Sequence, residues 1–403
     1  MRVTIINQPI NNRGDEAAHR SMMRELNKRF PDSQFTVLFV NKDQESINEF
    51  IVPSSQNHYL TIKSFTKGNN FFKKWSLRLG LISLSFLHPE HRRVKRIFLD
   101  SDLIICAPGG ICMGGFQNWE HVYWLYMAKK LGKKIIYLSR SFGPFKTKTV
   151  WDRVFKKRSI ELLNYFDFLS IRDQNTMKLA DELGLSYIET VDTALNFVPK
   201  IQENKYRDLI GDEDYCVYVP NSLKWHHGFK NCSKENIDFM YLQIFDLIRN
   251  KFPNLKIVML PQLYKQRIND EAYFKMLKTK TNIENIIIIP ETCGSDLQQD
   301  IISKAKFLIG ARYHSVVFAI NNEIPFVGLS YEHKISGLLR ILSLEDRMVN
   351  IENLSDEDVA SGKISREVEG VLKLNSSLNE PKYKAFDIVK DCFDALEYKI
   401  RAK

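Results

Sequence analysis

The chain contains 403 residues, of which 44% are hydrophobic and 26% are charged, and these fractions are ordinary for a folded protein and exclude wholesale disorder. Because this length exceeds what one hydrophobic core usually organises, we expect two domains. The 58 Lys and Arg residues outnumber the 48 Asp and Glu residues, and the resulting formal charge of +10 favours anionic partners. Nucleic acid is not expected among them, because the sequence contains no recognisable nucleic-acid-binding module and no isolated basic tail.

The cysteine pattern and the hydropathy favour a cytoplasmic protein. Six cysteines are scattered through the sequence without a C-x-x-C pair, which is typical of a reduced protein. No apolar run approaches the roughly 20 residues needed to cross a bilayer, so no membrane-spanning segment is expected. Residues 71–87 mix aromatic, basic and aliphatic side chains. Two interpretations of that segment remain open, namely a helix packed into its domain and peripheral contact with the inner face of the membrane.

Strands and helices are expected to alternate through the first half of the chain, which is typical of a parallel sheet. The expected strands are 1–6, 34–40, 102–107, 134–139 and 166–171, and the expected helices include 15–29, 118–131 and 150–163. Asp15 opens the first helix, where it fits either an N-terminal cap or a ligand-binding carboxylate at the end of a parallel strand. The four glycines of residues 108–115 match neither the G-x-G-x-x-G pattern nor the Walker pattern, so nucleotide binding is not predicted.

The alternation restarts after a polar and charged stretch at residues 199–214, so we place the domains at 1–198 and 199–403. The further strands that we expect are 215–219, 255–260, 285–289, 306–309 and 325–328, and helices follow towards the C-terminus. The whole pattern predicts an α/β protein made of two Rossmann-like parallel-sheet domains that face each other across a cleft.

The stretch from Gly310 to Ser315 combines anion binding with proton transfer. We expect it to form a strand, a sharp turn at a conformationally free glycine, and a helix start whose unpaired amides attract an anion. Arg312 carries a planar set of donors suited to phosphate or carboxylate, and His314 exchanges a proton near neutral pH. The alternative interpretation is that Arg312 caps a neighbouring strand and that His314 is a core residue.

A second arginine stands in the same kind of position. Arg172 follows the apolar strand at 166–171 and opens a helix, so two guanidinium groups are expected to face one anion. The alternative is a local pair between Arg172 and Asp173. No metal site is predicted, because the adjacent His226 and His227 have no accompanying ligand cluster. Ser315 lacks a G-x-S-x-G elbow, which argues against a serine hydrolase.

Six short motifs occur in a specific order and spacing. They are Asn12-x-Gly14-Asp15, Pro108-Gly-Gly110, Ser141-Phe-Gly-Pro144, Ile171-Arg-Asp173, Gly310-x-Arg-Tyr-His-Ser315 and Pro325-x-Val-Gly328. Over about residues 3–340 this set resembles the polysaccharide pyruvyl transferase family. The resemblance implies a GT-B-like fold and a transferase that moves the enolpyruvyl group of phosphoenolpyruvate onto two sugar hydroxyls as a ketal, with release of phosphate. The implied acceptor is a sugar of an exopolysaccharide or capsule, or its lipid-linked precursor, and phosphoenolpyruvate is a co-substrate, so no cofactor is expected.

The same resemblance implies roles for residues of this sequence. For the ketal chemistry that the resemblance implies, we assign to His314 the transfer of a proton to the methylene carbon or to the leaving phosphate, with Asp15 or Glu332 as the candidate base. The implied donor-binding residues are Arg172, Arg312, Tyr313, His314 and Ser315, and the implied acceptor-binding residues are Asn12, Gly110, Gln117 and Asn221. Two other functions remain open, namely a nucleotide-sugar-dependent GT-B glycosyltransferase and a non-catalytic anion-binding module.

Overall fold

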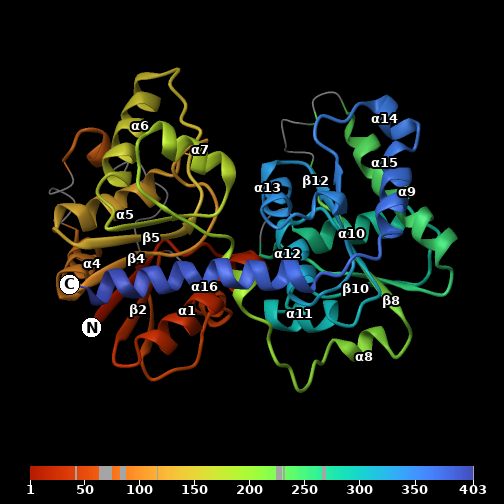
Figure 1. Ribbon diagram of the computed structural model, residues 1–403, viewed down its shortest axis with the longest axis horizontal. Coiled ribbons are helices and arrows are strands. Elements are labelled where there is room, and N and C mark those ends of the chain that lie inside the picture. Colours follow the sequence, from red (N-terminus) through yellow and green to blue (C-terminus); the bar gives the residue numbers. More distant parts are fainter. Residues whose placement is uncertain are drawn as a thin grey trace. The chain divides into compact units, whose positions relative to one another are not determined.

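The computed structural model of the protein describes residues 1–40, 43–62, 75–81, 88–115, 117–223, 229, 232–265 and 269–402. Its chain divides into two compact units (Figure 1). Unit 1 comprises Met1–Ile10, Ala18–Ala194 and Ile388–Lys403, and unit 2 comprises Asn11–Ala17 and Leu195–Asp387. Each unit contains one parallel sheet, which confirms the predicted α/β class with two parallel-sheet domains.

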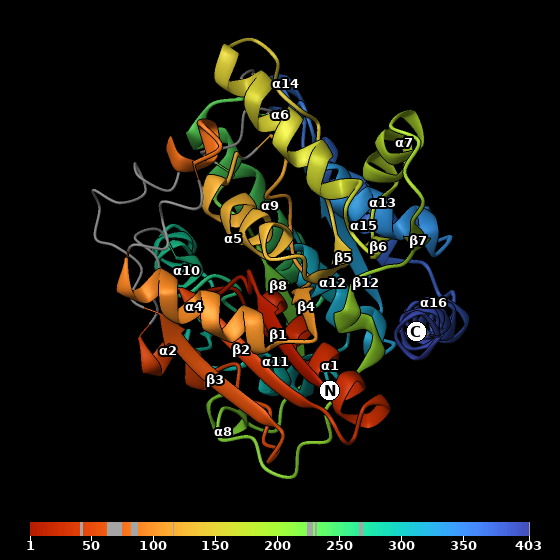
Figure 2. The ribbon, with the colours of Figure 1, turned by 90° about the vertical axis from the view of Figure 1, so that its left-hand side faces the viewer.

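Unit 1 contains a seven-stranded sheet in the order β3-β2-β1-β4-β5-β6-β7, most of which can be followed in Figure 2. Its strands are β1 (Arg2–Ile6), β2 (Gln34–Val40), β3 (Asn57–Ile62), β4 (Leu103–Cys106), β5 (Lys134–Arg140), β6 (Phe168–Ile171) and β7 (Ile188–Glu189). β1 pairs with β2 on one side and with β4 on the other, so the direction of winding reverses between β1 and β4. The carboxyl ends of strands at such a reversal are where open α/β sheets bind ligands.

Helices connect the parallel strands of unit 1, as crossovers between parallel strands require. The connecting helices are most of α1 (Arg13–Arg29), α2 (Gln44–Asn48), α4 (Pro89–Asp100), α5 (Trp119–Lys130), α6 (Val150–Leu163) and α7 (Gln174–Glu182). The start of the 3₁₀ helix η2 (Thr193–Asn196) and the last part of α16 (Asn379–Arg401) also belong to unit 1 but follow its last strand. Side chains of the sequence set several of these starts. Thr149 and Asp152 form a reciprocal capping box at α6, and the Asp173 carboxylate accepts a hydrogen bond from the Thr176 N–H at α7.

The centre of the first sheet is apolar because both of its faces are covered. β4 has the sequence LIIC, and all four residues are buried. The helix α5, which packs against β5, is buried at every position from His121 to Ala128. A helix that is buried on all sides belongs to a core rather than to a surface. The loops at the carboxyl ends of β4 and β5 are therefore anchored on a packed interior.

Unit 2 contains a six-stranded parallel sheet in the order β10-β9-β8-β11-β12-β13. Its strands are β8 (Tyr215–Val219), β9 (Lys256–Met259), β10 (Ile286–Ile288), β11 (Leu308–Gly310), β12 (Phe326–Ser330) and β13 (Met348–Asn350). β8 pairs with β9 on one side and with β11 on the other, so the winding of this sheet reverses between β8 and β11. The second sheet has its own ligand-binding edge at the carboxyl ends of these two strands.

The strands of unit 2 are also joined by helices, with the first turn of α1 and the beginning of α16 added from the two ends of the chain. The helices are α8 (Arg207–Ile210), α9 (Lys234–Lys251), α10 (Asp270–Thr279), α11 (Ser295–Ile302), α12 (Tyr313–Asn321), α13 (His333–Ile341), η4 (Glu345–Arg347), α14 (Asp356–Ala360) and α15 (Lys363–Leu372). α12 packs against β11 and α13 against β12, which places the starts of both helices at the carboxyl edge of the sheet.

Part of the 71–87 segment lies within the described residues. The ring of Trp75 meets Trp151 edge-on at 5.2 Å, and the guanidinium of Arg78 lies 4.2 Å from the centroid of Trp151 and 4.8 Å from that of Trp119. Residues 71–74 and 82–87 lie outside the described residues. Within the described ranges, no helix has the length and apolar character needed to cross a membrane.

Candidate functional site

Asn221 and Arg312 stand at the edge of the unit 2 sheet where the winding reverses. Asn221 follows β8 and Arg312 follows β11, and these strands are neighbours, with Val219 opposite Gly310. The N–H of Ala311 donates to the Val219 carbonyl at 2.8 Å, which extends the pairing up to the residue before Arg312. The fold therefore brings a predicted acceptor-binding residue and a predicted donor-binding residue to one edge.

Gly310 is required by a close side-chain contact and not by its backbone conformation. Its φ does not lie in the positive region, so the expected special conformation was wrong. A Cβ at this position would instead overlap the hydroxyl oxygen of Ser315. That hydroxyl donates to the Arg312 carbonyl at 2.6 Å, and the Ser315 N–H donates to the same carbonyl at 3.0 Å. The turn thus fixes Arg312 at the N-cap position of α12.

The guanidinium of Arg312 is held by a buried carboxylate. Its Nη2 pairs with Oδ1 of Asp270, and the two side chains are 13% and 3% exposed. The other carboxylate oxygen of Asp270 accepts from the N–H groups of Gln262 at 2.9 Å and Leu263 at 3.0 Å. The Nε of Arg312 is buried without a hydrogen-bond partner among the described residues. Buried N–H groups are nearly always hydrogen-bonded in folded proteins, so we expect the Nε–H of Arg312 to donate to a ligand.

Asn221 presents a second unsatisfied group at this edge. Its side chain is fully buried, and within the described part of the chain neither its Nδ2 nor its Oδ1 has a hydrogen-bond partner. Burial of an unpaired polar group costs about 1–3 kcal/mol, so we expect a ligand or water to bind this amide. Burial raises the pKa of Tyr241 and of Tyr331, and the nearby charge of Arg312 partly opposes both rises. The edge is thus a buried polar cluster around one guanidinium.

His314 packs directly on the first turn of α1. Glycine is needed at position 14, because a Cβ on Gly14 would overlap Nδ1 of the His314 imidazole. His314 is 8% exposed, and its ring meets that of Tyr313 edge-on at 4.9 Å. Asp15 follows Gly14 directly and belongs to the same unit. The structure therefore places His314 against Gly14, the residue before Asp15, one of the two residues predicted as the base.

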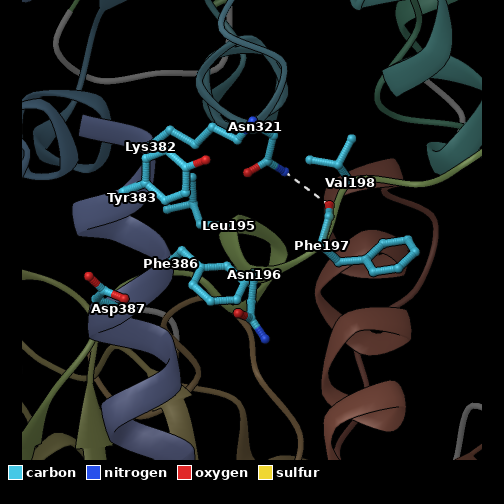
Figure 3. A pocket seen from close by; sticks show the side chains of 9 residues that line it. All are labelled: Leu195, Asn196, Phe197, Val198, Asn321, Lys382, Tyr383, Phe386 and Asp387. Carbon is cyan, nitrogen blue, oxygen red and sulfur yellow. Dashed lines mark hydrogen bonds between the residues drawn. The ribbon is translucent and has the colours of Figure 1, made fainter. Parts of the chain in front are cut away.

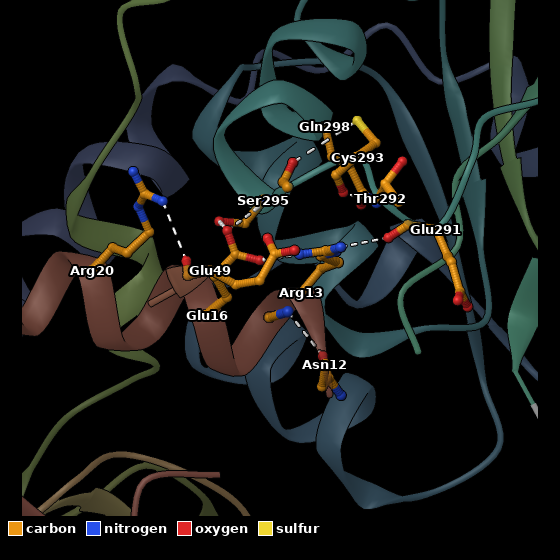
Figure 4. A network of polar contacts seen from close by, with 12 residues as sticks. Asn12, Arg13, Glu16, Arg20, Glu49, Glu291, Thr292, Cys293, Ser295 and Gln298 are labelled. Carbon is orange, nitrogen blue, oxygen red and sulfur yellow. Dashed lines mark hydrogen bonds and ion pairs between the residues drawn. The ribbon is translucent and has the colours of Figure 1, made fainter. Parts of the chain in front are cut away.

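A buried polar network fixes this first turn of α1 (Figure 4). Arg13 and Glu16 form an ion pair at 2.7 Å, and both side chains are 1% exposed. The guanidinium of Arg13 also donates to the Glu291 carbonyl and lies 3.8 Å from the ring centroid of Tyr264. The other oxygen of Glu16 accepts from the N–H of Ser295 at 3.0 Å and from its hydroxyl at 2.9 Å. The position of the turn is therefore set by desolvated polar groups that pair with one another.

The predicted capping role of Asp15 was wrong. α1 begins at Arg13, and Oδ1 of Asn12 accepts from the Gly14 N–H at 2.8 Å. Asp15 is consequently the third residue of the helix, where a carboxylate still interacts favourably with the positive end of the helix dipole. Asn12, which was predicted to bind the acceptor, here stabilises the start of α1.

Glu332 lies at the N-cap position of α13, and its carboxylate pairs with the Lys334 ammonium at 3.1 Å. The pKa of Tyr331 is raised mainly by burial and further by Glu332, and Arg312 acts on the same hydroxyl in the opposite direction. Glu332 is therefore close to the cluster around Arg312. Asp15 and Glu332 both stay candidates for the base.

Arg172 in unit 1 has the same kind of support as Arg312. It follows β6, and its Nη1 pairs with the fully buried carboxylate of Asp192. Asp192 also accepts from the Ala194 N–H at 3.0 Å. Asp173, the alternative partner considered from the sequence, caps α7. A guanidinium after a sheet strand, held by a buried carboxylate, thus occurs in each unit.

Two predicted acceptor-binding residues lie after β4 in unit 1. A Cβ on Gly110 would meet no heavy atom within 4 Å, so the space beside it is open. The side-chain amide of Gln117 donates to Asp152 at 2.7 Å, at the capping box of α6. The other two, Asn12 and Asn221, belong to unit 2.

Sequence reasoning missed two functional candidates, Arg140 and Asp270. Arg140 is the last residue of β5 and is fully buried, and its guanidinium donates to the carbonyl of Ala107 at 2.6 Å. Its position was a usable signal, since Arg172 and Arg312 were singled out for following a strand in the same way. Asp270 gave a weaker signal, because an aspartate at the start of a helix is ordinarily read as a helix-stabilising residue.

Within the described ranges, no group of three or more His, Cys, Asp and Glu side chains is arranged to hold a metal ion. His226 and His227 lie outside the described residues. The expectation that no metal or other cofactor is needed therefore stays a prediction.

Comparison with known proteins gives both a family and a fold. A family model described as polysaccharide pyruvyl transferase matches residues 12–333. Among solved structures, UDP-GlcNAc 2-epimerase from Methanocaldococcus jannaschii aligns with a TM-score of 0.61 and 13% identity over 99% of this chain and 100% of that one. The Neisseria meningitidis UDP-GlcNAc 2-epimerase bound to UDP-GlcNAc aligns with a TM-score of 0.59 and 12% identity over 98% and 99%. Anabaena Alr3699/HepE in complex with UDP-glucose aligns with a TM-score of 0.59 and 9% identity over the whole of both chains. These likenesses confirm the predicted GT-B-like fold.

Proposed function

The chain belongs to the polysaccharide pyruvyl transferase family, and from this membership we propose that it transfers the enolpyruvyl group of phosphoenolpyruvate to two hydroxyls of a sugar. The sugar is part of a cell-surface glycan, such as an exopolysaccharide or capsule, or of its lipid-linked precursor. The observation that supports this proposal best is the buried cluster at the β8–β11 edge of unit 2. It joins an arginine with an unpartnered donor, an unsatisfied amide and the start of α12.

Phosphoenolpyruvate, the proposed donor substrate, carries a phosphate and a carboxylate, and the cluster around Arg312 suits both groups. Arg312 offers planar hydrogen-bond donors to either anion, and the first N–H groups of α12 add the positive end of a helix dipole. Tyr313 and Ser315, in the first turn of α12, belong to the same proposed donor site. Arg172 is the second guanidinium proposed to bind the donor. Cationic side chains thus neutralise the donor without a metal ion or another cofactor.

The chemistry requires one acid and one base. The sugar hydroxyl loses its proton to the base and adds to carbon 2 of the enolpyruvyl group, while the methylene carbon gains a proton and becomes a methyl group. Phosphate then leaves, and the second hydroxyl loses its proton and adds to the same carbon to close the ketal. Of the two hydroxyl protons released, one balances the proton gained by the methylene carbon and the other is taken up by phosphate. His314 supplies the proton to the carbon or to the leaving phosphate, and Asp15 or Glu332 accepts the proton of the hydroxyl.

The test is to incubate the purified protein with phosphoenolpyruvate and a panel of glycans ending in galactose, mannose or glucose, including lipid-linked ones. We expect phosphate to be released only with a suitable acceptor, whose mass increases by one pyruvyl ketal that mild acid removes. Sugar transfer from a nucleotide donor, with phosphoenolpyruvate untouched, would overturn the proposal in favour of a glycosyltransferase. Chelation that abolishes turnover, with recovery on adding magnesium, would contradict the metal-free mechanism.

His314→Asn tests the role of the imidazole. The asparagine retains hydrogen-bonding capacity but cannot exchange a proton, so turnover should fall by about a hundredfold or more while binding of phosphoenolpyruvate persists. Turnover close to that of the wild type would assign the acid to another group.

A further inference from the structure

Unit 1 contains a cavity of about 360 Å³ at the carboxyl edge of its sheet. Asn7 and Gln8, which follow β1, line the cavity together with Cys112, which follows β4, and Arg140, which ends β5. The cavity therefore lies where the winding of the sheet reverses between β1 and β4. Both its place in the fold and its size, which falls within the roughly 300–1,000 Å³ of small-molecule sites, are those of a binding site.

A buried cation forms part of the cavity wall. The guanidinium of Arg140 donates to the carbonyl of Asn7 at 3.1 Å, and its Nη2 contacts Sγ of Cys112 at 3.3 Å. Burial lowers the pKa of His121, another lining residue, well below 6.5, and the charge of Arg140 lowers it further. His121 is thus neutral at physiological pH. The wall presents a fixed positive charge beside a neutral imidazole.

The remaining lining combines planar polar groups with apolar surface. Glu120 adds a carboxylate, Gln8 adds an amide, and Trp124 adds an indole ring, while Leu38 and Val40 are aliphatic. Carboxylate, amide and guanidinium groups can each bond two neighbouring hydroxyls, and an aromatic or aliphatic wall packs against C–H groups. A sugar ring offers hydroxyls around its rim and C–H groups on its faces. The lining therefore matches a sugar better than it matches a purely anionic ligand.

We propose that this cavity binds the acceptor as a hydroxyl-rich sugar ring, with Glu120 accepting hydrogen bonds from its hydroxyls and Arg140 fixing the wall through its contacts with Asn7 and Cys112. The inference rests on the proposed function, because that function requires a sugar acceptor. It assigns the acceptor to side chains that follow β1 or lie on β5 and α5, and the sequence motifs do not include them.

Cys112 provides a test that does not depend on turnover. It is partly exposed, whereas the other five cysteines, all of them within the described residues, are buried. Iodoacetamide should therefore alkylate Cys112 first, and a sugar in the cavity should block the reaction. With the glycan panel at about ten times its dissociation constant, the rate of alkylation should fall about tenfold, because only the unoccupied protein reacts. Phosphoenolpyruvate alone should give no protection, and mass spectrometry of the Cys112 peptide measures both rates.

Glu120→Gln tests the role of the carboxylate, and Glu182→Gln on the exposed end of α7 is the matched control. Glu120→Gln should raise the KM for the acceptor about tenfold while leaving the affinity for phosphoenolpyruvate unchanged, since a hydrogen bond to a charged group is lost. Glu182→Gln should change neither value. Thermal unfolding of both variants checks that the fold is intact.

The possible outcomes separate this inference from the proposed function. Protection of Cys112 by phosphoenolpyruvate instead of by glycans would overturn the inference. The absence of protection by a glycan that the protein pyruvylates would also overturn it, while the proposed function would stand. Protection by a glycan in a protein that never consumes phosphoenolpyruvate would support the sugar site and contradict the proposed function. A panel in which no glycan gives protection counts against the site.

Discussion

Arg312 and Asp270 form a pair in which two charges are removed from water together. Because Asp270 also accepts from two backbone N–H groups, it holds one side of the guanidinium in place and leaves Nε for a ligand. Such pairs are sensitive to the loss of one partner, since the other charge then remains buried and uncompensated. The carboxylate therefore orients Arg312, and the charge available to an anion depends on how many donors the guanidinium can present at once.

Arg312→Lys should weaken the binding of phosphoenolpyruvate by about 2 kcal/mol. A lysine ammonium is a point charge that cannot satisfy Asp270 and also contact the donor with a planar pair of hydrogen bonds. Isothermal titration calorimetry measures the change. Arg249→Lys is the control, because Arg249 lies exposed on α9 in a surface pair with Asp246 at 3.4 Å. An unchanged affinity in Arg312→Lys would remove Arg312 from the donor site.

Gly14→Ala should destabilise the fold by about 1–3 kcal/mol, because the added methyl group overlaps the His314 ring and one of them must move. Turnover should fall as well, since the proposed acid is displaced. Gly370→Ala is the matched control. Gly370 lies in α15, where a Cβ would meet nothing within 4 Å, and alanine there should stabilise the helix by about 0.5–1 kcal/mol. Urea denaturation measures the free energy of unfolding of each variant and of the wild type. If Gly14→Ala were as stable as the wild type, the ring of His314 would not pack on Gly14.

Local pattern was enough to single out Gly310, Arg312 and His314 as candidates, because the chemistry of each residue and the short spacing between them are visible in one stretch. It was not enough to find Asp270 beside Arg312 or Gly14 beside His314. Both contacts join positions far apart in the chain, and only the folded sheet brings them together. The same limit explains why Gly310 was identified for the wrong reason, since its neighbour Ser315 and its φ depend on how the turn packs.

At the scale of elements, α1 was predicted as a helix, but its first turn packs in unit 2 and the rest of it packs in unit 1. The apolar spacing predicted one helix ending at Arg29, as observed, but placed its start at Asp15 instead of Arg13. Asn12 and Asp15 are both good capping residues, so local preference does not choose between them. The buried pair of Arg13 with Glu16 favours the observed start, because residues three apart lie next to each other on a helix.

Peripheral contact with a membrane can be tested on the described part of the 71–87 segment. Leu79 and Leu81 are 57% and 46% exposed, whereas Trp75 is engaged with Trp151. If this segment binds the membrane, the double substitution Leu79→Ser and Leu81→Ser should reduce sedimentation with anionic liposomes, because exposed apolar side chains drive interfacial binding. Leu209→Ser, at a position 52% exposed in unit 2, should have no effect. A folded wild-type protein that does not sediment with liposomes would contradict membrane contact.

At the scale of the molecule, the alternation of apolar strands and amphipathic helices predicted two parallel-sheet domains, and the structure confirms them. Strand order follows less directly, since each sheet begins in its middle, at β1 or β8, and winds outwards in both directions. Local pattern also gave no sign that residues 11–17 pack within unit 2 or that residues 388–403 pack within unit 1. Within unit 2, side chains of η2 and of the first part of α16, which are far apart in the sequence, line a mainly apolar cavity of about 360 Å³ (Figure 3).

Stability against acid is a property of the whole molecule that two buried histidines should influence. Burial lowers the pKa of His19 from 6.5 to about 3, the charge of Arg20 adds to the effect, and burial also lowers the pKa of His121 well below 6.5. Between about pH 6.5 and pH 3 the unfolded chain binds a proton at His19 that the folded chain does not bind. The contribution of His19 to the free energy of unfolding is therefore fully present above pH 6.5 and decreases as the pH falls from 6.5 towards 3.

The free energy of unfolding should consequently decrease on acidification from pH 7 to pH 5, with each such histidine contributing up to about 1.4 kcal/mol per pH unit below pH 6.5. His19→Gln, which removes one titrating group while retaining a polar side chain beside Gln8, should make that decrease shallower. His58→Gln is the control, because His58 is exposed on β3. Urea denaturation at several pH values measures the slopes. If His19→Gln and the wild type lose stability equally with falling pH, His19 is protonated in the folded protein and its burial does not keep it neutral.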